Sequence, residues 1–149
     1  MSTSLTARPV DQVDVRGPRF AAWITTVVLA IVVLTGSWGL LAIQAVVFGI
    51  GAALGPRRSP YGLLYARLVA PRLSAPSERE PVAPLRFAQA VGLVFAVLGT
   101  LGLALGAPVL GGVATVAALV AALLNAAFGL CLGCQLYPLL AVARTRTSH

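Results

Sequence analysis

Charged residues are scarce in this chain of 149 residues, since Asp, Glu, Lys and Arg together make up only 10% of it. A soluble domain usually carries about 25%. Lysine is missing altogether, and no charged residue of any kind falls within 20–56 or 87–143. Together with a hydrophobic fraction of 58% and a mean hydropathy of +0.92, these absences argue against an ordinary soluble enzyme. They predict an integral membrane protein whose first partner is the lipid bilayer.

The charge that is present has one dominant sign, with 11 basic residues against four acidic ones and a formal net charge of +7. In a soluble protein, such a balance would suggest a nucleic-acid partner. Here the arginines flank apolar segments, and they form no basic stripe interleaved with the aromatic residues on which bases stack. We therefore expect no nucleic-acid binding and interpret the arginines as signals of membrane orientation.

Four apolar segments predict an all-α fold of four transmembrane helices. The turns at 35–39 and 106–108 are short, so the segments pair into two hairpins, at 20–54 and 87–130. Apolar character continues beyond 130, which gives a stretch longer than the thickness of a bilayer. We expect this stretch to break at Pro138. The predicted spans are Phe20–Leu34, Leu40–Leu54, Phe87–Leu105 and Val109–Leu130.

Polar segments lie before, between and after the hairpins. The central one is a basic loop with six prolines, and the spacing of its leucines and tyrosines predicts a short interfacial helix over Tyr61–Val69. The remainder of this loop, Pro71–Pro84, and the first residues of the chain, Met1–Val13, are predicted to be irregular. The three segments are an N-terminal tail at 1–19, the loop at 55–86, and a C-terminal segment at 131–149 with a juxtamembrane helix.

The distribution of the arginines predicts the topology. Basic residues occur in the tail, in the central loop and at Arg144 and Arg146, whereas both hairpin turns are uncharged. By the positive-inside rule, all three basic segments lie in the cytoplasm. We therefore predict a multi-pass protein of the cell membrane with its N- and C-termini inside.

Small and polar residues within the spans suggest how the helices pack. Glycines such as Gly99 and Gly102 recur along the third span and let backbones approach closely. Gln44, Gln89 and Asn125 are interpreted as interhelical hydrogen-bonding residues, with a polar substrate path as the alternative. No ionisable residue lies within a span, which argues against an ion-coupled transporter. Four short spans bury little surface, so a homo-oligomer is a plausible state.

The two cysteines of the chain, Cys131 and Cys134, form a single Cys-Leu-Gly-Cys motif. On a helix, residues three apart share one face, and their Cα atoms would lie about 5–5.5 Å apart, within disulfide range. The predicted topology places the pair at the cytoplasmic end of the fourth span. Because Cys134 lies nearer the polar boundary, we expect it to be the more accessible thiol.

Three interpretations of the motif compete. The first is a redox dithiol that exchanges with a thioredoxin-like or sulfur-carrying protein, which a reducing cytoplasm favours over a structural disulfide. The second is a metal site, but two thiolates fall short of the usual four ligands and His149 lies on the terminal tail. The third is packing alone, in a Gly129-x-x-x-Gly133 helix contact. We favour the first and expect neither a metal nor a cofactor.

Several segments of the chain are similar to those of a known family. They are Arg16-Gly-Pro-Arg-Phe20, Gly55-Pro-Arg-Arg-Ser-Pro-Tyr61, Arg86-Phe-Ala-Gln89, and Leu124-Asn-Ala-Ala-Phe-Gly-Leu-Cys-Leu-Gly-Cys134 followed by Tyr137. With these segments the chain resembles a bacterial membrane family called domain of unknown function 4395. The resemblance covers about residues 14–137, and the Phe-Gly-x-Cys-x-Gly-Cys segment is its most specific part. It implies a four-span protein, often actinobacterial, encoded in some genomes near thioredoxin-like or rhodanese-like proteins. Such a neighbour would be the cytoplasmic partner of the cysteine pair.

The sequence thus favours a membrane thiol-redox or sulfur-relay component in which Cys131 and Cys134 are the reacting residues. A structural or scaffolding membrane protein without chemistry of its own is the main alternative. A small-solute channel or carrier is a third. Whether the chain is an enzyme stays open at this point.

Overall fold

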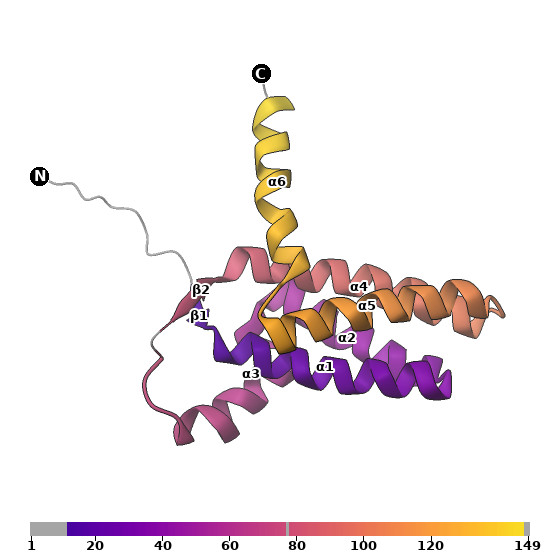
Figure 1. The fold of residues 1–149 in the computed structure, drawn as a ribbon, viewed down its shortest axis with the longest axis horizontal. Coiled ribbons are helices and arrows are strands. Elements are labelled where there is room, and N and C mark those ends of the chain that lie inside the picture. Colours follow the sequence, from indigo (N-terminus) through magenta and orange to yellow (C-terminus); the bar gives the residue numbers. More distant parts are fainter. Residues whose placement is uncertain (1–11, 77, 148–149) are drawn as a thin grey trace, which may run out of the picture.

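The computed structural model describes residues 12–76 and 78–147, apart from the side chains of 141 and 144–147. Within these residues the fold is all-α, as predicted, with four long helices side by side (Figure 1). A further helix, α6 (Leu132–Thr147), leaves this bundle and runs across the direction of the long helices. The long helices are α1 (Arg16–Thr35), α2 (Trp38–Leu54), α4 (Val82–Ala104) and α5 (Pro108–Phe128).

Two tight turns connect the helices within each hairpin. Gly36 ends α1 in the left-handed region, at φ 67°, and its N–H donates to the Val32 carbonyl at 2.7 Å. Ser37 then caps α2, because its hydroxyl accepts the N–H of Leu40 at 3.2 Å. In the second hairpin, Gly106 supplies the left-handed residue, at φ 83°, and Pro108 opens α5. The predicted hairpins are therefore present.

Glycines bring the helices together, as their pattern predicted. A Cβ atom on Gly102 of α4 would lie 2.6 Å from the backbone N of Gly111 in α5, so only glycine fits there. A Cβ on Gly99 would similarly lie 2.7 Å from a Leu41 methyl. The buried core between the helices consists of Leu29, Val32, Leu41, Ala45, Phe48, Ala96 and Ala118.

The outer faces of the bundle are apolar. Three of its helices, α1, α4 and α5, are long and apolar enough to cross a membrane, while α2 is apolar but shorter, with 17 residues. In α1, α4 and α5, only 17% to 28% of the most apolar window is buried inside the protein. Large side chains such as Ile43 and Val113 are accordingly more than half exposed, at 63% and 64%.

Helices α1 and α4 begin earlier than the predicted starts at 20 and 87, and each carries an arginine in its additional N-terminal part. Residues 82–84, which were predicted to be irregular, belong to α4. Arg86 of α4 donates to the carbonyls of Ala52 and Ala53, both at 2.8 Å, at the end of α2. Arg19 of α1 donates to the Ala126 carbonyl of α5 at 3.3 Å. Each hairpin thus caps the C-terminal carbonyls of a helix in the other hairpin, where a positive charge is favoured.

A short antiparallel sheet lies where the sequence predicted irregular chain. Strand β1 (Gln12–Asp14) pairs with β2 (Arg79–Pro81), with Val13 opposite Glu80. The prediction was wrong at 12–13 and 79–81 because Val13 gains burial, at 5% exposure, only when the two distant segments meet. The rest of the predicted irregular tail, 1–11, lies outside the described residues.

The central loop contains the predicted helical segment. Ser59 caps α3 (Pro60–Leu64), and its hydroxyl accepts the N–H of Gly62 at 3.1 Å. The chain continues through a π-helical turn, η2 (Tyr65–Val69), and a 3-10 turn, η3 (Ala70–Arg72). Another 3-10 turn, η1 (Pro56–Arg58), precedes α3.

The break after the last long helix occurs at Gly129, and the prediction of a break at Pro138 was wrong. Gly129 adopts the left-handed conformation, at φ 71°, and its N–H donates to the Asn125 carbonyl at 3.0 Å. The N–H of Leu130 donates to the Leu124 carbonyl, which completes a Schellman-type helix end. Pro138 instead lies inside α6.

Candidate functional site

The cysteine motif lies at the start of a helix and not along the end of the preceding one. Helix α5 ends at Phe128 and α6 begins at Leu132, so Cys131 occupies the N-cap position. The backbone N–H of Cys134 donates to the Cys131 sulfur at 3.3 Å. The N–H of Gln135 donates to the Cys131 carbonyl at 3.1 Å, which is the first helical hydrogen bond. Cys131 therefore caps α6 with its sulfur as a serine would with its hydroxyl.

The two sulfur atoms lie at disulfide-bonding distance. The Cα atoms of Cys131 and Cys134 are 5.1 Å apart, which matches the spacing expected from the sequence and lies within the range of natural disulfides. Both side chains are partly exposed. The pair can therefore be linked or opened without a large movement of the backbone, and a reagent can reach it.

The position of Cys131 has an electrostatic consequence. The N-terminus of a helix carries a partial positive charge and unpaired N–H groups, and it stabilises a thiolate over a thiol. The sequence alone suggested no such stabilisation, because the motif seemed to follow an apolar helix without a break. Around the motif, as elsewhere in residues 12–76 and 78–147, no group of three or more His, Cys, Asp or Glu residues could hold a metal ion.

Contacts with α4 hold the motif in place. A Cβ atom on Gly133 would lie 2.6 Å from the Ala88 Cα, so the backbones of α6 and α4 touch at this glycine. The rings of Phe87 and Tyr137 pack beside this contact, with centroids 6.0 Å apart. Gly129 takes no part, since a Cβ there would meet nothing within 4 Å. The proposed Gly129-x-x-x-Gly133 packing motif is thus wrong for Gly129 and correct only in giving Gly133 a helix contact.

A cavity of about 720 Å³ lies beside the motif, and sequence analysis did not predict it. The ends of all four long helices, α3 and the start of α6 surround it, and Cys131 forms part of its wall. Most of the lining is apolar. Its polar side chains include Thr25, Tyr61, Gln89 and Asn125, and its charged ones are Asp14, Arg57 and Arg79. Only the polar residues within the spans gave a hint of such a space in the sequence.

Of the three polar residues in the spans, Gln44 forms the predicted kind of interhelical hydrogen bond, from α2 to Tyr61 of α3, and the other two do not. Gln44 is fully buried, and its Oε1 accepts the hydroxyl of Tyr61 from the loop at 2.6 Å, while its Nε2 has no partner in the described part of the chain. The side-chain amides of Gln89 and Asn125 make no hydrogen bond among the described residues and line the cavity instead. The alternative interpretation, a polar lining, fits these two amides better.

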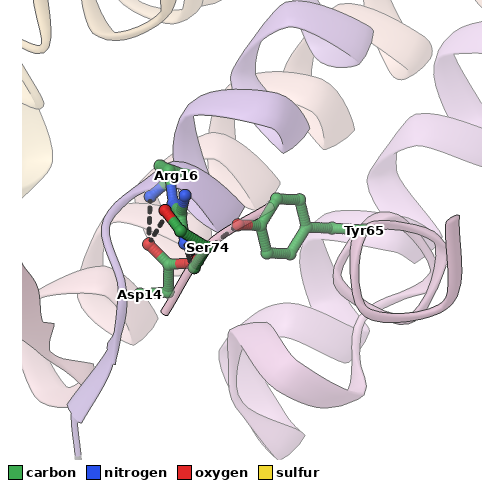
Figure 2. Close-up of polar contacts among 4 residues, drawn as sticks. All are labelled: Asp14, Arg16, Tyr65 and Ser74. Atoms are coloured by element: carbon green, nitrogen blue, oxygen red, sulfur yellow. Dashed lines mark hydrogen bonds and ion pairs between the residues drawn. The ribbon is translucent and has the colours of Figure 1, made fainter. Parts of the chain in front are cut away.

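A polar cluster closes the charged end of the bundle (Figure 2). Asp14 accepts the Arg16 side chain, in an ion pair of 2.9 Å, and the Tyr65 hydroxyl at 2.7 Å. Arg16 also donates to the Ser74 carbonyl at 2.9 Å. The hydrogen bond from Arg16 above all lowers the pKa of Asp14 to about 2. Because Asp14 and Tyr65 both line the cavity, this cluster ties the N-terminal strand and the loop across its polar end.

Comparison with known proteins identifies a family. No similar chain was found among curated proteins or among solved structures. The sequence profile of DUF4395, a domain of unknown function, matches residues 13–141, which is most of the chain and includes both hairpins and the cysteine motif. The match agrees with the resemblance seen in the sequence. The chain therefore belongs to the DUF4395 family.

Proposed function

We propose that the protein is an integral membrane protein whose four long helices all cross the bilayer. Support comes from the exposed apolar side chains around the bundle and from the three helices of sufficient length and hydropathy. Apolar surface of this extent is rare on soluble monomers. At 17 residues α2 is at the short end of spanning length. Arg86 caps the C-terminal end of α2 by donating to two of its last carbonyls, so fewer carbonyls are left unpaired there.

The proposed orientation has the N-terminus, central loop and C-terminus in the cytoplasm of the cell. The strands and α3 lie at one end of the bundle and the two uncharged turns at the other (Figure 1). The arginines of the helix starts and of the loop therefore share one end, such as Arg19, Arg57 and Arg86. This distribution is typical of the cytoplasmic side. The cysteine motif follows the end of α5, on that same side.

We further propose that Cys131 and Cys134 form a redox dithiol that exchanges with a thioredoxin-like or rhodanese-like cytoplasmic protein. The observation that carries this proposal is the N-cap geometry, in which the Cys131 sulfur accepts the Cys134 N–H at the start of α6. It favours Cys131 as the attacking thiol, whereas the sequence did not indicate which cysteine attacks and favoured Cys134 only as the more accessible thiol. The contact of Gly133 with Ala88 supports a fixed geometry for the pair.

The exchange would proceed in two displacements. The Cys131 thiolate attacks one sulfur of a partner disulfide, forms a mixed disulfide and releases the partner's other sulfur as a thiolate. The Cys134 thiolate then attacks the Cys131 sulfur, which closes the internal disulfide and releases the second partner sulfur. The protein loses two electrons and the partner gains them. Run in reverse, the same steps reduce Cys131 and Cys134.

Trapping of the mixed disulfide tests this proposal. The Cys134→Ser variant lacks the resolving thiol, so we expect it to accumulate a covalent adduct that reductant releases. Cys131→Ser and the double variant serve as matched controls and should give little or no adduct. The proposal is wrong if none of the three variants forms a reducible adduct and the wild-type cysteines keep one state after oxidant and reductant.

A scaffolding function is the second candidate, and the glycine-mediated helix contacts favour it. Gly102 and Gly111 allow backbones to touch, which gives a rigid bundle with continuous apolar faces. A scaffold would keep its partners in the double cysteine variant and lose them when Gly102 is replaced by leucine. A redox component would show the opposite dependence on the cysteines.

A further inference from the structure

The cavity beside the cysteine motif has the properties of a small-molecule site. Its volume of about 720 Å³ lies within the range of typical ligand pockets, roughly 300–1,000 Å³. Apolar side chains such as Ala121 and Phe95 provide most of its wall, and Cys131 lies in that wall. A molecule held there would be in reach of one thiol of the pair.

The polar groups of the cavity indicate what that molecule carries. Gln89 of α4 and Asn125 of α5 line the space, and neither side-chain amide has a hydrogen-bond partner among the described residues. An entirely apolar occupant, such as an acyl chain, would leave both amides unsatisfied, at a cost in free energy. A ligand with an apolar body and oxygen atoms at separate points would satisfy them.

The proposed redox chemistry further restricts the chemical class of the ligand. When the exchange runs in reverse, a partner dithiol reduces Cys131 and Cys134, and a second redox couple must then oxidise them again. Inside a bundle embedded in lipid, that couple must be lipid-soluble and must exchange two electrons and two protons. We propose that the cavity binds a quinone, whose carbonyl oxygens meet the amides of Gln89 and Asn125, and that the Cys131–Cys134 dithiol reduces it. This inference rests on the proposed redox function and names its second substrate class.

The proposed reaction balances without another reagent. The Cys131 sulfur forms a bond to a ring carbon, and the ring takes up the electron pair. The Cys134 thiolate then attacks the Cys131 sulfur, so the S–S bond forms while the C–S bond breaks. The electron pair of that bond stays on the ring, and the two thiol protons end on the two oxygens. One dithiol and one quinone give one disulfide and one hydroquinone.

The test uses the full chain, reduced, desalted and kept without oxygen in lipid nanodiscs. A benzoquinone with a short isoprenoid tail is added, and hydroquinone formation and thiol loss are followed together. We expect one hydroquinone for each pair of thiols lost. In a parallel sample, oxidised glutathione replaces the quinone and tests the dithiol itself.

Two substitutions on α5 provide a matched pair. Ala121→Phe places a ring in the cavity, and it should raise the quinone concentration at half-maximal rate at least about tenfold. Ala127→Phe adds the same ring at an exposed position outside the cavity and should leave that concentration unchanged. Should Ala121→Phe fail to fold, photolabelling of the wild-type chain with an azidoquinone gives the same information. The label is expected on α4, α5 or the cysteine motif.

The outcomes separate the two proposals. If glutathione disulfide oxidises the pair but no quinone concentration does, the quinone inference is wrong and the redox function stands. Equal quinone rates in Ala121→Phe and Ala127→Phe, or a label outside the cavity, also overturn the inference. The inference is also overturned if a lipid stays in the cavity and prevents labelling by the azidoquinone. If neither oxidant changes the thiols, the proposed function fails and the inference with it.

Discussion

Cys131 is expected to be the more reactive thiol of the reduced protein, because its sulfur accepts a backbone hydrogen bond. Its sulfur accepts the backbone N–H of Cys134 at 3.3 Å at the start of α6. A hydrogen bond to a charged group contributes about 1.5–3 kcal/mol, and 1.36 kcal/mol corresponds to a tenfold change in a protonation equilibrium. At pH 6 the thiolate is a minor species of an ordinary cysteine. The thiolate fraction of Cys131 should therefore be roughly 10- to 100-fold higher in the folded protein than in the unfolded chain.

The expected increase in the alkylation rate of Cys131 is smaller than the increase in its thiolate fraction. A thiolate that is stabilised is also a weaker nucleophile, and a Brønsted coefficient of about 0.5 removes half of the effect on a logarithmic scale. We therefore expect Cys131 to be alkylated roughly 3- to 10-fold faster than the same cysteine in the unfolded chain. Cys134 accepts no comparable hydrogen bond among the described residues and should show no such gain.

Single-cysteine variants make the comparison direct. Cys134→Ser leaves Cys131 with its hydrogen bond, because the donor is the backbone N–H of residue 134 and not its side chain. Cys131→Ser leaves Cys134 and supplies a hydroxyl for the cap. Alkylation by iodoacetamide at pH 6 is followed by mass spectrometry in nanodiscs and in denaturant. Equal rates for both thiols, or a faster Cys134, would refute the electrostatic reasoning.

Three further predictions concern the elements that hold the site. Gly133→Ala places a Cβ atom 2.6 Å from the Ala88 Cα, so it should destabilise the fold by about 1–3 kcal/mol and lower the thermal midpoint. Gly112→Ala is the matched control, because a Cβ atom there meets nothing within 4 Å, and it should leave the thermal midpoint unchanged. Arg86→Gln removes the two hydrogen bonds that cap the C-terminal carbonyls of α2, and it should speed amide hydrogen exchange at that end of the helix. An unchanged exchange rate would count against the cap. The pKa of Asp14 is lowered from 3.8 to about 2, so its contribution to stability is complete above pH 3.8 and is lost as the pH falls toward 2. Pepsin should cut the N-terminal strand increasingly over this range, and Asp14→Asn should expose the strand to a neutral protease at pH 7.

Local patterns in the sequence predicted the hairpins, because the information needed lies within a few residues. The left-handed Gly36 and the Ser37 cap stand next to each other in the turn. Long-range pairing was not predictable in this way. Tyr65 meets Asp14 across 51 positions, and β1 meets β2 across a similar distance, so no single segment carries the signal.

The proximity of the two cysteines was predicted from the sequence, but the structure around them was not. The spacing of Cys131 and Cys134 was sufficient to select the pair and to predict a Cα separation close to the observed 5.1 Å. The helix start was missed because proline was taken as the stronger breaker. Gly129 is the residue that can adopt a positive φ and satisfy the last carbonyls of α5, so the helix ends there. The cavity depends on how distant helix ends meet, which no local pattern encodes.

The most direct test of the redox proposal measures the thiol state of the full chain in equilibrium with redox buffers. The protein is incubated at a series of dithiol-to-disulfide ratios, quenched with acid and labelled with a bulky maleimide. We predict two states only, with two labels or none, that interconvert reversibly as a two-electron couple. Labelling of Cys131 and Cys134 that stays the same at every ratio would contradict the account.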